Sequence, residues 1–193
     1  MPQRIALELQ ALVAETRRKY PDVRQSAEHL LAQWQADADR TVSELQSCKD
    51  PSSHALLQMI VLACETRSPK VIQLALSLLQ SSIPLRILPD TSLVTVIDTL
   101  HTLLSAPGRT DVDVQLKILQ IVSSLLVTYA NVTSELLSRA LMLCFTLYEH
   151  SRVVVVSSTA AAMLRQNVMV VFEKVQSEDQ SFDAIQNEDA AVN

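Results

Sequence analysis

Residues 111–149 read DVDVQLKILQIVSSLLVTYANVTSELLSRALMLCFTLYE and contain the clearest helical pattern in the chain. The first half places apolar side chains every three or four positions, at Ile118, Val122, Leu125 and Tyr129. The second half repeats this spacing with the apolar pairs Leu136/Leu137, Ala140/Leu141, Leu143/Cys144 and Leu147/Tyr148. Because such residues share one face of an α-helix, the segment predicts two amphipathic helices, 111–129 and 133–149. Thr133 is the expected N-cap of the second helix.

The same spacing continues on both sides of this segment. It predicts six further helices, at 3–17, 22–47, 52–66, 70–82, 89–105 and 155–176. The prolines fall at helix starts and in the intervening loops, as Asp50-Pro51 and Ser68-Pro69 illustrate. After residue 50, alternate helices begin roughly 37 to 44 residues apart, close to the period of HEAT and armadillo repeats. We therefore predict an all-α, armadillo/HEAT-like right-handed stack of about eight antiparallel helices, forming one domain over residues 1–176.

The composition excludes several other classes of protein. The chain has 193 residues, 48% of them hydrophobic, and a single glycine, Gly108. Glycine-rich phosphate loops and dinucleotide-binding motifs need several glycines where the backbone meets the ligand. Tight β-hairpins also favour glycine, which argues against an all-β fold. A chain of this length buries roughly 70% of the surface that its unfolded form exposes, so it needs no disulfides or metal to fold.

The net charge of −5 belongs to one end of the chain. Residues 177–193 contain five acidic residues and no lysine or arginine, so the remaining 16 acids and 16 bases leave residues 1–176 neutral. We expect 177–193 to be an acidic tail or a linker to a following domain. No large basic surface that would mark a nucleic-acid-binding protein stands out.

The residues that usually carry catalysis or metal binding are scattered. Cys64 and Cys144 lie on apolar stripes and are expected to be core residues, and Cys48 is far from both. No histidine has a second ligand at helical spacing, and the serines lack a glycine elbow. The start of the chain lacks the pattern of a secretory signal. The sequence predicts a cytoplasmic domain with no catalytic residues, cofactor or metal.

Two surface regions are candidates for binding. In the last predicted helix, the apolar stripe expected to face the core is Ala161, Leu164, Val168, Val171/Phe172 and Val175. A second face carries Met163, Asn167 and Val170 and ends at Lys174, so the helix is either central in the stack or docked on another domain. The candidate protein interface on this helix comprises Met163, Arg165, Gln166, Val170 and Lys174.

The other region is the basic cluster Arg17, Arg18 and Lys19, followed by Arg24. Cations at the end of a helix complement its dipole, which is the simpler interpretation of the cluster. The alternative is a contact with anionic lipid or phosphoinositide. Nearby acidic residues weaken this alternative.

Three stretches resemble a known family. Residues 158–174, STAAAMLRQNVMVVFEK, are similar to the closing helix of the dimerisation and cyclophilin-binding (DCB) domain. This domain begins the large Arf guanine-nucleotide exchange factors and their Mon-two (monensin-sensitivity) relatives, and the Mon-two branch is the more similar. Residues 17–28, RRKYPDVRQSAE, and 63–71, ACETRSPKV, resemble the same domain, and the helix order agrees from about residue 3 to 176.

The resemblance implies a non-catalytic interaction or scaffold domain of a large Golgi and endosome trafficking protein. In this family the domain contacts neighbouring domains of the same protein or a second copy of itself. The Mon-two relatives lack the exchange module, and their associates include Dopey-family proteins, Arf-like GTPases and phospholipid flippases. The resemblance also implies a cytoplasmic location, peripheral on Golgi or endosome membranes. The alternative function is a peripheral membrane module that binds anionic lipid through Arg17, Arg18, Lys19 and Arg24.

Overall fold

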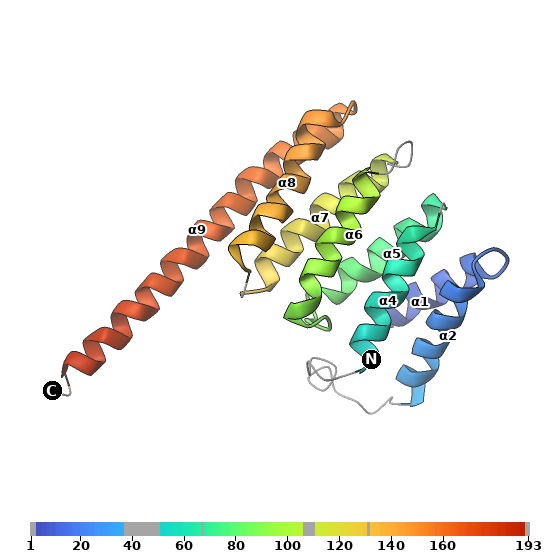
Figure 1. The fold of residues 1–193 in the computed structure, drawn as a ribbon, viewed down its shortest axis with the longest axis horizontal. Coiled ribbons are helices and arrows are strands. Elements are labelled where there is room, and N and C mark those ends of the chain that lie inside the picture. Colours follow the sequence, from blue (N-terminus) through green and yellow to red (C-terminus); the bar gives the residue numbers. More distant parts are fainter. Residues whose placement is uncertain (1–2, 37–50, 67, 106–110, 131, 192–193) are drawn as a thin grey trace.

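The computed structural model describes residues 3–36, 51–66, 68–105, 111–130 and 132–191, and within these ranges it is built of helices alone (Figure 1). The α-helices are α1 (Gln3–Thr16), α2 (Pro21–Ala36), α4 (Pro51–Glu65), α5 (Pro69–Ser82), α6 (Leu93–Ser105), α7 (Val112–Thr128), α8 (Ser134–His150) and α9 (Val154–Ala191). A short 3-10 helix, η1 (Asp90–Ser92), precedes α6. The predicted all-α fold is confirmed.

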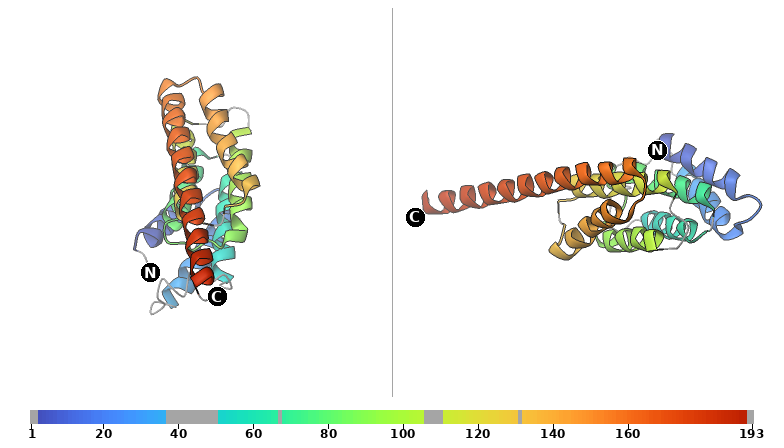
Figure 2. Two further views of the ribbon diagram at one scale, coloured as in Figure 1. Left: turned by 90° about the vertical axis from the view of Figure 1, so that its left-hand side faces the viewer. Right: turned by 90° about the horizontal axis from the view of Figure 1, so that it is seen from above.

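The helices form two layers (Figure 2). Helices α1, α5, α7 and α9 pack side by side in one layer, and α2, α4, α6 and α8 form the other. Polar contacts between successive units join residues about one repeat apart: Lys117 Nζ donates to Ser77 Oγ at 2.7 Å, and Arg139 pairs with Asp98 at 2.6 Å. This arrangement is the predicted HEAT/armadillo-like stack.

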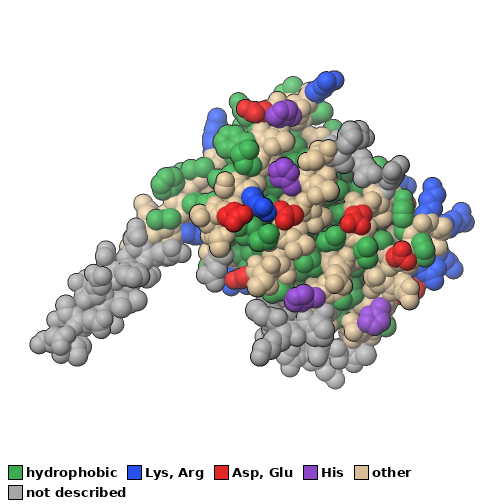
Figure 3. Space-filling view, in the orientation of Figure 1, with side chains coloured by type: hydrophobic (Ala, Val, Ile, Leu, Met, Phe, Trp, Pro, Cys, Tyr) green, Lys and Arg blue, Asp and Glu red, His purple; other side chains and the backbone are tan. Residues whose placement is uncertain are grey.

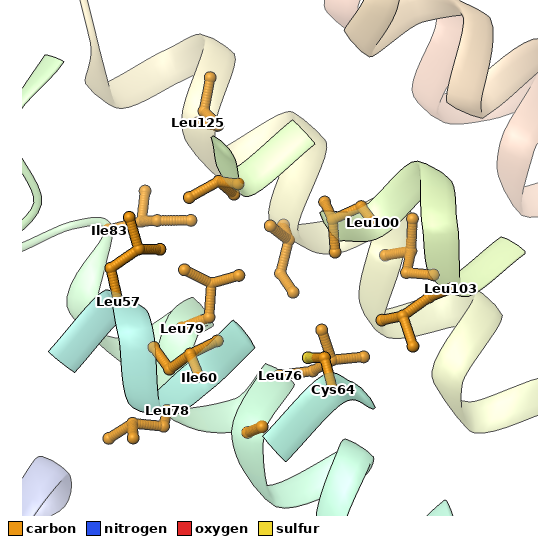
Figure 4. Packing of buried hydrophobic residues seen from close by; sticks show 14 of the residues in the cluster. Leu57, Ile60, Cys64, Leu76, Leu78, Leu79, Ile83, Leu100, Leu103 and Leu125 are labelled. Carbon is orange, nitrogen blue, oxygen red and sulfur yellow. The ribbon is translucent and has the colours of Figure 1, made fainter. Parts of the chain in front are cut away.

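One continuous hydrophobic core runs through the stack (Figure 4). Its central part joins four helices through buried side chains that include Leu57, Ile60, Leu76, Leu79, Leu100 and Leu125. Burying a side chain of this size contributes about 1.5–3 kcal/mol. Since each helix pair buries its apolar stripe against the next pair, the stack gains stability by adding neighbours.

Local signals place the helix ends. Thr133 is the N-cap of α8 and accepts a hydrogen bond from the Leu136 N–H at 3.3 Å, as expected. Pro69 occupies the first turn of α5. At the end of α7, the buried Tyr129 leaves the helix and its hydroxyl donates to the Leu88 carbonyl at 2.8 Å. These contacts fix the turns between layers.

Three helix bounds differ from the sequence-based expectation. The predicted helix 89–105 begins with the 3-10 turn η1. The predicted helix 22–47 is described as α2 up to Ala36, and the remainder lies outside the described residues, as do Cys48 and Gly108. The last helix does not end at 176: α9 continues to Ala191 and extends past the rest of the stack (Figure 1). A domain boundary at residue 176 stays a prediction.

Candidate interaction surface at the end of the stack

A buried asparagine decides which face of α9 points inward. Asn167 is fully buried, and its Oδ1 accepts a hydrogen bond from Ser123 Oγ of α7 at 2.8 Å. Its Nδ2 lies 3.9 Å from Cys144 Sγ of α8. Because a buried amide left without partners costs about 1–3 kcal/mol, these contacts fix the rotation of α9 about its axis. Val156 and Ala160 are buried on the same face.

Lys174 continues this inward face. Its ammonium group donates to the backbone carbonyls of Leu126 and Tyr129, the latter at 2.5 Å. Arg86 binds the neighbouring Thr128 carbonyl at 3.1 Å through Nε and lies over the Tyr129 ring. The last carbonyls of a helix lack backbone partners and carry partial negative charge, so both cations stabilise the end of α7. Lys174 therefore makes contacts within the chain.

The core stripe predicted for α9 is correct only in part: Leu164 packs against the hydrophobic core. The expected core stripe is exposed at Val168 (42%), Phe172 (64%) and Val175 (48%). The expected second face packs on α7, where Met163 Sδ lies 3.1 Å from Ser123 Oγ. The prediction was wrong at Val168, Phe172 and Val175, because polar contacts with α7 and α8, rather than the apolar pattern, select the inward face.

The five candidate interface residues on α9 consequently separate. Arg165 and Gln166 are exposed, whereas Met163, Val170 and Lys174 are only partly exposed and lie toward α7. No contact with a partner tests any of these assignments, so the interface of Met163, Arg165, Gln166, Val170 and Lys174 stays a prediction.

An apolar groove runs between α8 and α9. It encloses about 620 Å³ and is lined by Phe145, Tyr148, Ala161, Leu164, Arg165, Val168 and Met169. Phe145, Tyr148 and Met169 are about half exposed or more. Phe172 and Val175 continue the apolar surface further along α9, and hydrophobic side chains are visible on this helix in Figure 3. We call the groove together with Phe172 and Val175 the C-terminal apolar face.

Sequence reasoning missed Phe145 and Tyr148 as parts of this face. Both lie in α8, and Tyr148 belongs to one of the adjacent apolar pairs of that helix. Such pairs make an apolar stripe wider than one neighbouring helix can cover, and this width is the signal that could have identified them.

The first part of α9, Val154–Ser177, is long and apolar enough to cross a membrane by length and composition. These two criteria also select packed helices of water-soluble proteins. Here the segment buries Asn167 against α7 and binds the end of α7 through Lys174. It is therefore packed on the protein along one face and exposed along the other.

A second groove, of about 330 Å³, lies between α4 and α6 and includes Cys64, Glu65 and Asp98. Burial, followed by the charge of Glu65, raises the pKa of the Cys64 thiol to about 12, and burial raises the pKa of Cys144 to about 11. Reactive cysteines need a lowered pKa, so both thiols behave as the expected core residues. Among the described residues no group of three or more His, Cys, Asp or Glu side chains could hold a metal ion.

The basic cluster lies at the opposite end of the stack. Arg17, Arg18 and Lys19 are all exposed in the turn between α1 and α2. Arg24, one turn into α2, forms an ion pair with Glu28 at 2.7 Å. Blue side chains gather at this end of the molecule in Figure 3. The structure thus brings three of the four predicted cations together and places the fourth beside a carboxylate.

Comparisons with known proteins cover almost the whole stack. The family model for the Mon2/Sec7/BIG1-like dimerisation and cyclophilin-binding domain matches residues 2–179. The chain is 34% identical over 173 residues to a Protein MON2 homolog of Homo sapiens, and 28% identical over 184 residues to one of Drosophila melanogaster. It is 24% identical over 181 residues to Protein MON2 of Saccharomyces cerevisiae. These alignments cover 90%, 95% and 92% of this chain but 10% of each relative.

Proposed function

Because the chain belongs to the Mon2/Sec7/BIG1-like family of dimerisation and cyclophilin-binding domains, we propose that it is a non-catalytic interaction domain of a longer Golgi and endosome trafficking scaffold. The chain spans about a tenth of the length of the curated relatives it matches. The trafficking role therefore belongs to the longer protein, and this domain supplies contacts within it and around it.

The C-terminal apolar face is the observation that carries the proposal. Stacks of helical repeats need a polar outer surface on their terminal units to stay soluble. Here the last helix pair instead exposes Phe145, Tyr148, Val168, Met169 and Phe172. Contiguous apolar surface of this kind marks a site of contact with another protein or with a membrane. The interaction role of the family favours a protein. The domain's contacts are accordingly made by the α8–α9 end of the stack.

The resemblance described above suggests which partners to examine. Within the longer protein these are its other domains and a second copy of this one. Outside it they are Dopey-family proteins, Arf-like GTPases and phospholipid flippases, at the cytoplasmic face of Golgi or endosome membranes. In this proposal all of these partners bind the longer protein. Within this domain, the contact surface to be tested is the α8–α9 end of the stack.

Two nearly equally exposed valines provide a matched test. Val175 on the C-terminal apolar face is 48% exposed, and Val94 on α6 is 47% exposed. Val175→Glu should abolish co-purification of the tagged domain with untagged domain and with the remainder of the parent protein, whereas Val94→Glu should not. Circular dichroism should show that both variants stay folded. If Val175→Glu left every one of these contacts intact, the C-terminal apolar face would not be the contact surface.

Three consecutive exposed cations favour a second candidate function, the binding of anionic lipid through the α1–α2 turn. Flotation with vesicles containing phosphoinositide or phosphatidylserine tests it. Replacing Arg17, Arg18 and Lys19 by glutamine should then release the protein from anionic vesicles. Absence of flotation of the unmodified chain would exclude this function.

A further inference from the structure

The two layers of the stack differ in charge. Helices α2, α4, α6 and α8 carry six acidic and two basic residues, whereas α1, α5, α7 and the part of α9 up to Ser177 carry four acidic and five basic residues. The first of these layers faces the viewer in Figure 3, where red side chains are spread across it. We call its outer surface the acidic layer; its acids are Asp22, Glu28, Glu65, Asp98, Glu135 and Glu149. A surface of this charge favours a basic partner over an acidic one.

A groove of about 330 Å³ lies within the acidic layer, between α4 and α6, and we call it the α4–α6 groove. Its apolar lining includes Val61, which is half-buried, and Leu103, which is buried. Glu65 and Asp98 also line it and are exposed. Because ligand pockets usually enclose about 300–1,000 Å³, a groove of this size suits one long side chain. Arginine and lysine combine an apolar stem with a charged end, and the lining offers a surface for each part.

The hydrogen-bonding groups of the groove are acceptors. Thr99 Oγ1 donates to the Thr95 carbonyl at 2.7 Å, and Thr102 Oγ1 donates to the Asp98 carbonyl at 2.9 Å. Since a hydroxyl group has one proton, these two lining oxygens can only accept any further hydrogen bond. The ionised carboxylates of Glu65 and Asp98 likewise only accept. Guanidinium and ammonium groups, which donate and never accept, complement these four groups.

The other side of α6 shows how the acidic layer binds a cation. There Arg139 of α8 contacts Asp98 of α6 at 2.6 Å and Glu135 of its own helix at 3.5 Å. One guanidinium thus joins acids of two neighbouring helices. The α4–α6 groove likewise has an acid from each of its two helices, Glu65 and Asp98, but none of the described residues that line it is basic. A cation from outside the chain can take the equivalent place.

The end of α4 adds negative charge to the same groove. Glu65 is the last residue of α4, and the last turn of this helix contains no basic residue. The final carbonyls of a helix carry partial negative charge. At the end of α7, Lys174 and Arg86 donate to such carbonyls. A cation in the α4–α6 groove would be attracted to the end of α4 for the same reason.

We propose that the α4–α6 groove is a second interaction site of this domain, which receives an arginine or lysine side chain from a basic segment of a partner protein. The stem of that side chain lies against Val61 and Leu103, and its charged end donates to Glu65 and Asp98. The remaining acids of the layer attract further basic residues of the same segment, which favours a polypeptide over a small cation. This site goes beyond the proposed function, which concerns the α8–α9 end.

A labelled peptide tests the site. The probe is a fluorescein-labelled peptide of alternating arginine and alanine, and fluorescence anisotropy at low ionic strength, where exposed charges are least screened, measures its affinity. Glu65→Gln should weaken binding at least about tenfold, whereas Glu149→Gln should weaken it less than about twofold. Glu149 is an exposed acid of the same layer outside the groove, so both variants lose one negative charge. Absence of binding to the unmodified chain, or equal weakening in the two variants, would overturn the proposal.

Filling the groove from within gives an independent test that removes no acid. Thr102→Arg places a guanidinium beside Asp98 and should abolish peptide binding. Gln58→Arg, on an exposed position of α4 that does not line the groove, adds the same charge and should weaken binding less than about threefold. Circular dichroism should show that both variants stay folded. Equal affinities of the two variants for the peptide would contradict a site in the α4–α6 groove.

Competition and a third variant identify the occupant. An unlabelled peptide of alternating glutamate and alanine should not displace the probe. Spermidine that displaced it as effectively as the unlabelled arginine peptide would make the occupant a free polyamine and overturn the proposal. Val175→Glu, which tests the α8–α9 end, should leave peptide binding unchanged, so the two surfaces are tested separately. Loss of peptide binding in Val175→Glu would instead place the peptide on the C-terminal apolar face.

Discussion

The two ends of the stack have similar interiors and different outer faces. The α1–α2 end buries Ile5, Leu9 and Leu12, and the α8–α9 end buries Ala140, Leu143 and Leu147. On the outside, the described part of α1 and α2 exposes one large hydrophobic side chain, Leu7. The α8–α9 end exposes ten, namely Met142, Phe145, Tyr148, Val153, Val154, Val155, Val168, Met169, Phe172 and Val175.

The two ends differ in their outer surfaces and not in how well their inner faces are packed. Since both ends pack their inner faces well, the apolar outer face of α9 is not a consequence of incomplete folding. The first helix pair instead carries polar and charged side chains outside, including the exposed ion pair Arg24–Glu28 at 2.7 Å, and so serves as its own cap. The last pair exposes apolar side chains instead, and in our proposal a partner covers them.

The largest effect concerns the two interiors. Leu9→Ala and Leu143→Ala each remove a fully buried side chain, one at each end. Each should lower the free energy of unfolding by about 2–5 kcal/mol, through lost burial and the cavity that remains. Urea denaturation followed by circular dichroism measures both values. A cost below about 1 kcal/mol for Leu143→Ala alone would show that the C-terminal end is loosely packed. The two ends of the stack would then not have similar interiors.

The next effect concerns the asparagine that orients α9. Asn167→Ala should cost about 1–3 kcal/mol, since Ser123 Oγ loses its acceptor in a buried position. Ser123→Ala in the same background should add little, because both members of the hydrogen bond are then gone. A double-mutant cycle in urea measures this coupling. Strictly additive costs would mean that the Ser123–Asn167 contact does not hold α9 in place.

The helices themselves follow from local sequence signals. The three-to-four spacing, the Pro69 and Thr133 starts and the repeat of about 40 residues are all local or periodic properties. The orientation of α9 is not. The inward stripe of this helix is the less apolar of its two stripes, and the choice between them depends on Ser123 and Cys144, which lie 44 and 23 residues away in the sequence. A pattern confined to one helix contains no information about such partners.

The extension of α9 has a local cause that the charge pattern obscured. Residues 177–191 contain five acids, which suggested a solvated tail, but they contain no proline or glycine. Alanine, glutamine and glutamate favour helix, so nothing in this segment ends the helix that begins at Val154.

The candidate site is formed by two helices, α8 and α9. Phe145 and Tyr148 belong to it because α8 packs beside α9, and a pattern within α8 alone does not contain this information.

A smaller effect concerns the two buried thiols, one in α4 and one at the C-terminal end in α8. Burial raises the pKa of Cys64 from 9.0 to about 12 and that of Cys144 from 9.0 to about 11. The unfolded chain therefore loses these protons first, so the stability is complete below pH 9 and falls as the pH rises toward the folded-state values. At pH 10 the loss should be about 1 kcal/mol for each thiol.

Alanine variants assign this pH dependence to its source. Cys64→Ala and Cys144→Ala should each remove part of the decline, measured as the urea midpoint between pH 8 and about pH 10.5. Similar contributions from the two positions would agree with equally well-packed interiors at the two sites. A decline unchanged by both substitutions would show that other groups, such as Tyr129 with its pKa raised to about 12, control the alkaline limit.

The smallest effect concerns the polar end. Arg24→Ala removes an ion pair with Glu28 in which both side chains are more than 40% exposed. An exposed pair of this spacing on a helix contributes about 0.3–0.5 kcal/mol, because water screens the charges and ordering two long side chains opposes their attraction. The urea midpoint should fall by no more than corresponds to a loss of about 0.5 kcal/mol in the free energy of unfolding. The sedimentation behaviour of the chain should not change.

Loss of self-association in Arg24→Ala would move the contact surface from the α8–α9 end to the α1–α2 end and reverse the comparison. Retained self-association together with weaker flotation on anionic vesicles would instead assign different tasks to the two ends, lipid contact to the first helix pair and protein contact to the last.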